Sequence, residues 1–543
     1  MSLTLKKISL VWFFVLSSVA CAYANGITIT NGQIIGQDTT ANTVTIQFDI
    51  SWYNSWRDST NYDAAWIFIK YSSDVGVTWS HATLKTSGTN PSGFSVGSGT
   101  VIDIVVPADK KGCFIRHAAS TGAAVTLSTT SIQIVWDYGT DGVSDANAWG
   151  VDTRINISGI EMVYVETGSF IAGDGNQPSG VSPSDYGFRQ GSSPSGKSPW
   201  AILDEGAISV LSTAVGPYYY ESAGNSGEDV SNSAFIIPAG FPKGYSAFYV
   251  MKHELSQGMY RDFLNTLTRT QQAARVVADI SGDSIPNYYV MSNGTTVAAR
   301  NGIRAPASGN GTTPPVVFGC DFNNNGTFNE SGDGEWIPMN YIAWQDAAAF
   351  ADWAALRSMT ELEFEKAARG KDIIPTNLEY AWGDVTPTQS VGAITNPGQN
   401  SEVNSTASAN MVYAAHANVP GPLRCGQFAA VGTSTRLATG GGYYGALDMS
   451  GNVRELVVTV GNATGRAYSG THGNGALSSA GNADIADWPG YSSGENTAAT
   501  GSGQRGGDWY AADTLSRISE RTNAANASTR SSYIGARLAR TAP

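Results

Sequence analysis

Hydrophobic and polar residues alternate along the first part of the chain. In residues 43–53 the apolar side chains fall on every second position, from Val44 to Trp52, with polar residues between them. The same period recurs at residues 102–106 and 132–136, and clusters of Gly, Asn, Asp and Ser separate these runs. Such alternation, bounded by turn residues, is typical of half-buried antiparallel strands. The pattern predicts an all-β sandwich of roughly seven or eight strands over residues 25–157.

The period changes after residue 158. Residues 256–267 place apolar side chains on one helical face, with Ser256 as the predicted N-cap. A second helix is predicted over residues 344–357. A third follows over residues 361–369, where Thr360 and Glu363 can form a capping box and Gly370 can end the helix. Beyond Gly370 the chain is mostly loop and short strand. Residues 158–543 therefore form a predicted α+β domain whose long loops are expected to carry function.

Near the start of the chain, Lys6 and Lys7 precede an apolar run over residues 8–20 and the sequence Ala22-Tyr23-Ala24. This is typical of a secretory signal peptide, which we assign to residues 1–24. Cys21 leaves open an alternative, a lipidated N-terminus. No later apolar run is long enough to cross a membrane. We expect a secreted, extracellular or cell-surface protein.

Charge and cysteine content narrow the possible partners. The net charge of −13 gives no basic surface for nucleic acid. Three cysteines follow the leader, Cys113, Cys320 and Cys425. Such a small, odd number allows at most one disulfide, and Cys320–Cys425 is the pairing that we predict.

Several sequence blocks then point to a family. They are MVYVETGSFIAG (162–173), MKHELSQGMYRDFLN (251–265), residues 340–370, YAWGD (380–384), YYGALDMSGNVRELV (443–457), RGGDW (505–509) and GAR (535–537). In this order they resemble the formylglycine-generating enzyme, or sulfatase-modifying factor, domain. The resemblance implies a variant of the C-type lectin fold over residues 158–543. Residues 270–338, approximately, fall between two blocks as an insertion.

The resemblance also implies calcium. The family's Gly-Asn-Val-x-Glu block is similar to residues 451–455, which makes Asn452, Val453 and Glu455 candidate ligands. A second family site corresponds to Asn410, although its aspartate has no counterpart in residues 420–428. Calcium prefers several oxygen ligands held on a turn, and these residues can offer them. The alternative is a structural turn in which Glu455 pairs with an arginine.

One more calcium candidate comes from spacing alone. Asp321, Asn323 and Asn325 match the start of a calcium-binding loop, and Gly326 follows them. The twelfth position is Gly332 instead of a glutamate, so the pattern is incomplete. The alternative is an Asn-Gly turn solvated by water.

Catalysis by copper is not expected. Enzymes of the family carry two cysteines after the RGG block, and the matching positions here are Ala511 and Ser516. Cu(I) requires soft thiolate ligands, which neither residue supplies. The histidines outside the leader show no spacing for an iron site; they are His81, His117, His253, His416 and His472.

Residues 509–533 combine aromatic, polar and arginine side chains between scaffold-like ends. Such a composition is typical of recognition surfaces. The predicted groove residues are Trp509, Tyr510, Asp513, Arg517, Arg521 and Tyr533. The alternative is that the arginines pair with carboxylates. We therefore predict a catalytically degenerate domain for binding, adhesion or surface assembly, with an extracellular protein or carbohydrate as ligand. The competing hypothesis is an oxidoreductase or modifying enzyme of the formylglycine-generating or non-heme iron superfamily, with an unrecognised site.

Overall fold

The computed structural model describes most of the chain after the predicted leader. The described residues are 26–174, 187–191, 198–212, 216–219, 227–429, 435–525 and 529–543. The predicted signal peptide and Cys21 lie outside them. None of the described helices has the length and apolar character needed to cross a membrane.

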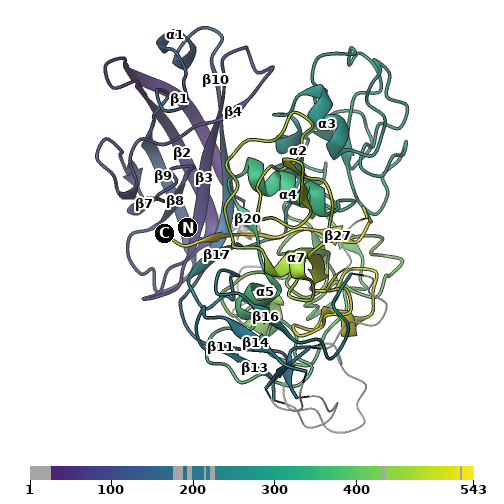
Figure 1. The fold of residues 1–543 in the computed structure, drawn as a ribbon. Coiled ribbons are helices and arrows are strands. Elements are labelled where there is room, and N and C mark those ends of the chain that lie inside the picture. The colour runs from purple at the N-terminus through teal and green to yellow at the C-terminus, as the bar shows by residue number, and fades with distance from the viewer. Residues whose placement is uncertain are drawn as a thin grey trace, which may run out of the picture.

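Two sheets pack together in the N-terminal part (Figure 1). The first has, in spatial order, β1 (Thr28–Asp38), β2 (Thr43–Ser55), β9 (Val125–Trp136) and β6 (Ser98–Gly99). The second has nine strands: β20 (Arg357–Ser358), β28 (Leu538–Thr541), β17 (Phe248–Met251), β10 (Arg154–Val165), β3 (Asp63–Ser72), β8 (Cys113–His117), β7 (Ile102–Val106) and β5 (Gly88–Thr89), with β4 (Ser80–His81) beside β3.

The alternating apolar residues fill the space between these sheets. Val44, Ile46, Phe48, Ile50 and Trp52 of β2 are all buried, as the period of two predicts. They meet side chains of β3, β7 and β8 from the second sheet. The N-terminal part is thus a β-rich, two-layered region. It carries one short helix, α1 (Asp145–Ala148), near the start of β10.

β10 joins the two parts of the chain. It pairs with β3 over residues 154–163 and with β17 over residues 162–165. The boundary predicted between residues 157 and 158 therefore falls inside one strand. β3 is buried along its whole length, because its two faces contribute to two different cores.

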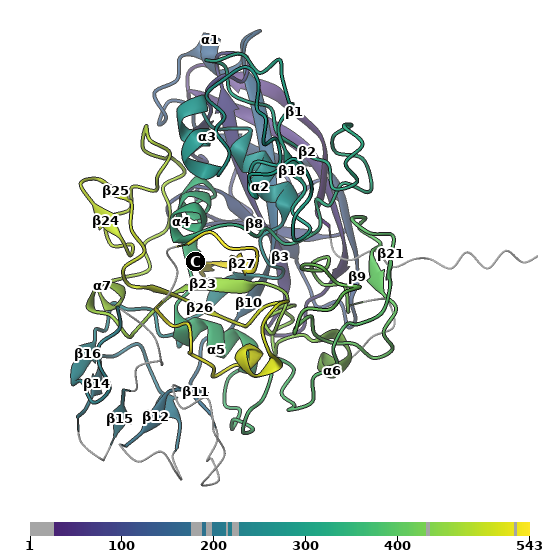
Figure 2. The ribbon, with the colours of Figure 1, turned by 90° about the vertical axis from the view of Figure 1, so that its right-hand side faces the viewer.

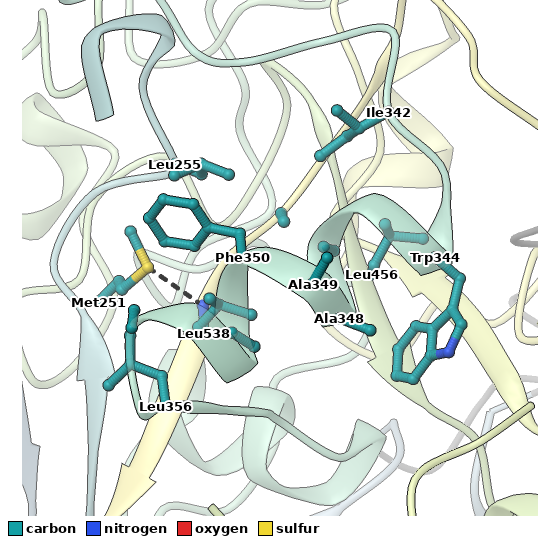
Figure 3. Packing of buried hydrophobic residues seen from close by; sticks show 14 of the residues in the cluster. Met251, Leu255, Ile342, Trp344, Ala348, Ala349, Phe350, Leu356, Leu456 and Leu538 are labelled. Carbon is teal, nitrogen blue, oxygen red and sulfur yellow. Dashed lines mark hydrogen bonds between the residues drawn. The ribbon is translucent and has the colours of Figure 1, made fainter. Parts of the chain in front are cut away.

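The second core lies on the other face of the nine-stranded sheet. It is covered by α2 (Gln257–Leu264) and α4 (Trp344–Trp353), and α3 (Arg269–Arg275) follows α2 in the chain. Figure 3 shows Phe350 of α4 beside Leu255. It also shows Met251 of β17, Leu456 of β23 (Arg454–Val458) and Leu538 of β28. Ser256 caps α2 as predicted, with its hydroxyl accepting from Met259 N.

α4 is shorter than the sequence predicts. It ends at Trp353 rather than near residue 357, and Ala355 takes a positive φ of 53°. The chain turns there because Arg357 and Ser358 form β20, which pairs with β28. The third helix, α5 (Glu361–Arg369), has the predicted capping box between Thr360 and Glu363.

Short pairs of strands and small helices complete the described chain (Figure 2). A three-stranded sheet holds β26 (Ser502–Arg505), β23 (Arg454–Val458) and β27 (Ile534–Gly535). The two-stranded pairs are β11 (Phe170–Ala172) with β13 (Trp200–Ile202), β12 (Arg189–Gln190) with β15 (Pro217–Tyr218), β14 (Ile208–Val210) with β16 (Phe235–Ile237), β18 (Ile303–Arg304) with β19 (Gly319–Cys320), β21 (Ile394–Thr395) with β22 (Val403–Asn404), and β24 (Tyr491–Ser492) with β25 (Glu495–Asn496). The remaining helices are α6 (Arg436–Thr439), α7 (Ala463–Arg466) and the 3-10 turn η1 (Asp513–Ser516).

The predicted disulfide is wrong. Cys113, Cys320 and Cys425 are all free and buried. Cys320 lies in β19, inside the insertion, whereas the Cys425 thiol lies 3.7 Å from the main-chain oxygen of Glu254 and donates to it. The two thiols are held by different elements, so they do not meet.

Candidate functional site

The segment after β26 begins with a tight glycine turn. Gly506 and Gly507 have φ values of 88° and 69°, a region that favours glycine. A Cβ on Gly507 would lie 2.2 Å from Oγ of Ser516. The glycine pair therefore lets the loop that contains Ala511 and η1 fold back onto the end of β26.

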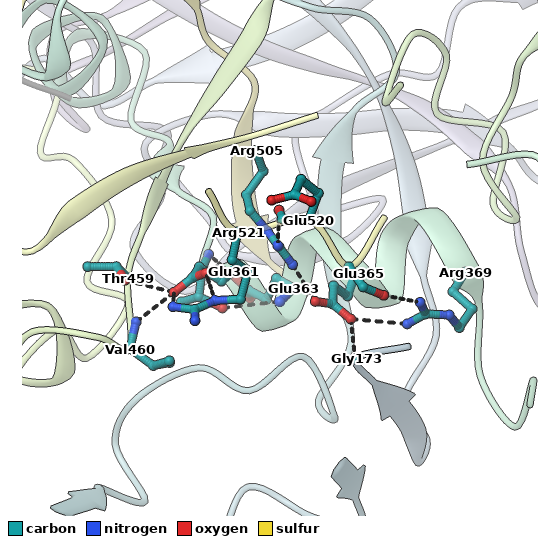
Figure 4. A network of polar contacts seen from close by, with 12 residues as sticks. Gly173, Glu361, Glu363, Glu365, Arg369, Thr459, Val460, Arg505, Glu520 and Arg521 are labelled. Carbon is teal, nitrogen blue, oxygen red and sulfur yellow. Dashed lines mark hydrogen bonds and ion pairs between the residues drawn. The ribbon is translucent and has the colours of Figure 1, made fainter. Parts of the chain in front are cut away.

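Buried ion pairs hold this segment on α5 (Figure 4). Arg505 pairs with Glu365, and Arg521 Nε lies 2.6 Å from Oε2 of Glu361. Burial alone would raise the pKa of Glu361, but the attraction of Arg521 and Arg505 holds it below its ordinary value. These arginines fix the backbone of the segment to the helix.

A third arginine ties the end of the chain to the core. Arg537 Nε lies 2.6 Å from Oε1 of Glu455, and its other nitrogens donate to the carbonyl oxygens of Met251, Lys252 and Leu447. Both side chains of the pair are fully buried. The arrangement matches the alternative in which Glu455 pairs with an arginine.

Ala511 and Ser516, which stand at the positions of the family's copper-binding cysteines, are held by backbone hydrogen bonds or by burial. Ala511 N donates to Asp508 at 2.8 Å, and Ala511 O accepts from Ala414 N at 2.7 Å. Ser516 is fully buried, and its hydroxyl has no hydrogen-bond partner among the described residues. The described cavity at this place, between β26 and the Leu515–Asn523 stretch, measures only about 10 Å³.

The six predicted groove residues do not form one open surface. Tyr510 is 63% exposed, and Asp513 and Arg517 are half-buried near Tyr380, whose hydroxyl donates to Asp513 at 2.7 Å. Trp509 is packed with Val412, Val419 and Leu423.

The prediction that Arg521 lines the groove is wrong. Its side chain is only 1% exposed, since it is enclosed by Glu361 and Glu228. Tyr533 is half-buried beneath the guanidinium of Arg454, which lies 4.6 Å from the ring centre. The remaining surface candidates are Tyr510, Asp513 and Arg517.

Protein groups already engage two of the side-chain oxygens assigned to calcium near β23, Oδ1 of Asn452 and Oε1 of Glu455. The Asn452 side-chain oxygen accepts from Leu423 N at 2.9 Å, while its amide donates to Glu254 at 2.7 Å. Val453 N donates to the same Glu254 carboxylate. The Glu455–Arg537 pair places a buried cation beside Oε1 of Glu455, while Oε2 of Glu455 has no hydrogen-bond partner among the described residues. In this arrangement few of the assigned side-chain oxygens are free, whereas calcium takes about six to eight oxygen ligands.

The other side chains predicted to bind calcium, in Asn410 and the 321–325 loop, are also hydrogen-bonded to protein groups. Asn410 accepts from Thr388 N and donates to Leu437 O. Asp321 accepts from the amides of Asn325 and Gly326 and pairs with Arg304. Asn323 and Asn325 each accept from a main-chain amide two residues on, as in Asx turns. The guanidinium of Arg304 pairs with the Asp321 carboxylate, which a calcium ion would need as a ligand.

Sequence reasoning missed Glu254. It is fully buried between β17 and α2, and burial together with the nearby Asp448 carboxylate raises its pKa well above the ordinary value. Its two oxygens accept hydrogen bonds from the side-chain amide of Asn452 and from the backbone amide of Val453. Nothing in the local pattern marks this residue, because its partners lie about 200 residues further along the chain.

The C-terminal part of the chain is similar to known proteins. Residues 209–542 match the family model described as the sulfatase-modifying factor enzyme 1-like domain. A formylglycine-generating enzyme of Streptomyces coelicolor is 47% identical over 51 residues, which cover 9% of this chain and 15% of that protein. One from Mycobacterium tuberculosis is 49% identical over 47 residues, 9% of this chain and 14% of that protein. The matched part is thus about a seventh of each relative's length. Since the family model covers more than half of the 543 residues, the chain belongs to the sulfatase-modifying factor enzyme 1-like domain family.

Proposed function

We propose that this chain is an exported binding protein whose sulfatase-modifying factor domain does not perform copper catalysis. The observation that carries the proposal is the pair Ala511 and Ser516, at the positions where the family resemblance places two thiolates. No cysteine follows Cys425 in the sequence. A methyl group cannot bind copper, and a serine hydroxyl is a hard, poor ligand for Cu(I).

The surroundings of these positions support a structural use of the segment. The Ser516 hydroxyl is buried against Gly507, where a reacting group would need access to oxygen and substrate. Within the described ranges, no three His, Cys, Asp or Glu side chains are grouped so that they could hold a metal ion. Arg505, Arg521 and Arg537 are committed to buried ion pairs.

We place the binding surface around Tyr510, Asp513 and Arg517, on a C-type-lectin-like domain. An exposed aromatic ring beside a carboxylate and a guanidinium can stack on a sugar or a peptide and hydrogen-bond to it. The leader predicted at residues 1–24 would direct export, so an extracellular protein or carbohydrate is the proposed partner. Calcium stays a prediction here, and the binding surface does not depend on it.

The first experiment is an activity assay. Purified protein is incubated with copper, a reductant and a cysteine-containing sulfatase peptide, and aldehyde formation is followed by mass spectrometry. The Streptomyces coelicolor formylglycine-generating enzyme serves as the positive control. We expect no aldehyde from this chain. Turnover above that of heat-inactivated protein would overturn the proposal.

A binding experiment tests the surface. A glycan array is probed with the protein and with Tyr510→Ala and Arg517→Ala variants, and Lys85→Ala serves as the matched surface control. Lys85 lies in the N-terminal part, with its side chain 41% exposed. Signals should fall in the first two variants and persist in the control. Signals that persist in all three place the binding surface elsewhere.

A further inference from the structure

The first half of β10 has an open edge. β3 covers one side of the strand over residues 154–163, but on the other side β17 pairs only with residues 162–165. After Met251 the chain leaves β10 and runs toward α2. Among the described strands, none pairs with residues 154–160 on this side.

Two hydrogen bonds show which main-chain amides and carbonyls of β10 point toward the open edge. Lys252 N donates to Glu161 O, so Glu161 directs its main-chain groups toward the β17 side. Tyr164 N donates to Tyr62 O on the opposite side. Because these directions alternate along a strand, Ile155, Ile157 and Gly159 direct their amides and carbonyls to the open edge. We find no described partner for these groups.

A cavity of about 620 Å³ runs along this edge. Its walls come from both parts of the chain: β1, β3 and β10 on one side, and α2, α4 and residues 329–336 on the other. The apolar lining includes Ile29, Phe68, Ile160, Met259, Phe350 and Trp353. Tyr510, Asp513 and Arg517, the proposed binding surface, do not line this cavity. The cavity is therefore a second, separate candidate site.

Carboxylates outnumber guanidiniums in the lining, which contains Glu161, Glu254, Asp262, Glu330 and Glu335 beside Arg261 and Arg424. Glu161 is paired with Lys252, and burial raises the pKa of Glu254 well above its ordinary value, so the excess of negative charge lies at the rim of the cavity. Arg261 pairs with Asp262 and Glu335, and Arg424 is buried against Glu402. Asp262 and Glu330 are exposed at the rim. The rim thus attracts a positively charged partner.

From these features we infer that the β10 edge binds an extended basic peptide of another protein as an added strand. The free amides and carbonyls of Ile157 and Gly159 supply main-chain hydrogen bonds, as in β-strand addition. The apolar walls take up alternate side chains of the peptide, and Asp262 and Glu330 hold its lysines or arginines. The inference goes beyond the proposed function, because it names a different surface and a peptide partner.

Two peptide pools test this inference. Both contain fluorescein-labelled peptides of about seven residues with alternating apolar residues; the other positions are Lys or Arg in one pool and Asp or Glu in the other. Fluorescence anisotropy should show binding of the basic pool only. An N-methylated basic pool, which cannot donate along one strand edge, should bind at least roughly tenfold more weakly. Failure of the basic pool to bind, or equal binding of the acidic or the N-methylated pool, overturns the inference.

Variants of the protein locate the site. Asp262→Lys combined with Glu330→Lys should weaken binding of the basic pool by roughly tenfold or more. Asp152→Lys, an exposed carboxylate outside the cavity, should leave it unchanged. Hydrogen exchange should slow in residues 154–160 when the basic pool is bound. Unchanged exchange there, or equal loss in the Asp152 control, would place the peptide elsewhere.

Discussion

Arg521 is a structural residue, although its type and its neighbours in the sequence resemble those of a binding surface. Its guanidinium contacts two carboxylates, Glu361 and Glu228, and stacks near Phe188 and Tyr219. Burial opposes its charge, but the two carboxylates raise its pKa well above the usual value. A side chain in this position stabilises the fold and is not available to a ligand.

Arg521→Met should therefore act on stability. Removing one partner leaves Glu361 and Glu228 buried without their cation, which costs on the order of 3–5 kcal/mol. The free energy of unfolding is measured by urea denaturation. Lys85→Met is the matched control, because it breaks a pair at 3.1 Å in which Lys85 is 41% exposed. That control should cost about 1 kcal/mol or less. Equal effects of the two substitutions would contradict this assignment.

In the loop at Asp321 and at the start of β23, an arginine pairs with the carboxylate that is predicted to bind calcium. Arg304 pairs with Asp321, and Arg537 pairs with Glu455. A carboxylate already paired in this way does not need a metal ion for its charge to be balanced. We therefore expect both turns to be stable without a bound ion.

Chelation tests this conclusion. An ion that binds only the folded state raises its stability, so its removal lowers Tm. We expect excess EGTA to leave Tm unchanged in differential scanning calorimetry, and added calcium to do the same. If EGTA lowers Tm and Glu455→Gln abolishes that response, then calcium binds near β23 after all. A response that persists in Glu455→Gln but is lost in Asp321→Asn would place the ion in the 321–325 loop.

Local patterns predicted the elements well. The period of two located β2, β7 and β9, and the cap residues located α2 and α5, because these signals act between neighbours in the chain. The end of α4 was missed, since it depends on the pairing of β20 with β28, about 180 residues away. Long-range pairing of this kind leaves no periodic signal.

The candidate site was predictable only in its residue types. The sequence shows that Ala511 and Ser516 stand where the family carries cysteines, but not that Ser516 is buried. It could not pair Arg521 with Glu228, because 293 residues separate them. The cavity at the β10 edge was likewise missed, since its walls come from parts of the chain that were treated as separate domains.

The nine-stranded sheet makes the two parts of the chain mutually dependent. Trp66 and Phe68 of β3 belong to the core beneath α4, and Trp66 Nε1 donates to Ala354 O at 2.9 Å. Lys70 of the same strand is buried and donates to Trp353 O and Gly475 O at 2.6 and 2.7 Å. Burial lowers the pKa of Lys70 well below its usual value. The N-terminal part therefore supplies one wall of the second core.

A fragment that starts at residue 158 should consequently not fold as the full chain does. It lacks β3 and the first residues of β10, so the core beneath α4 loses one wall and exposes apolar surface to water. The full chain should unfold in one calorimetric transition, whereas the fragment should show none or one at much lower temperature. Lys70→Ala tests the same coupling in the intact chain: two buried carbonyls lose their donor, at a cost of about 1–3 kcal/mol, against a smaller effect of Lys85→Ala. Two separate transitions in the full chain, or a fragment as stable as the whole, would show instead that the shared sheet does not couple the two parts.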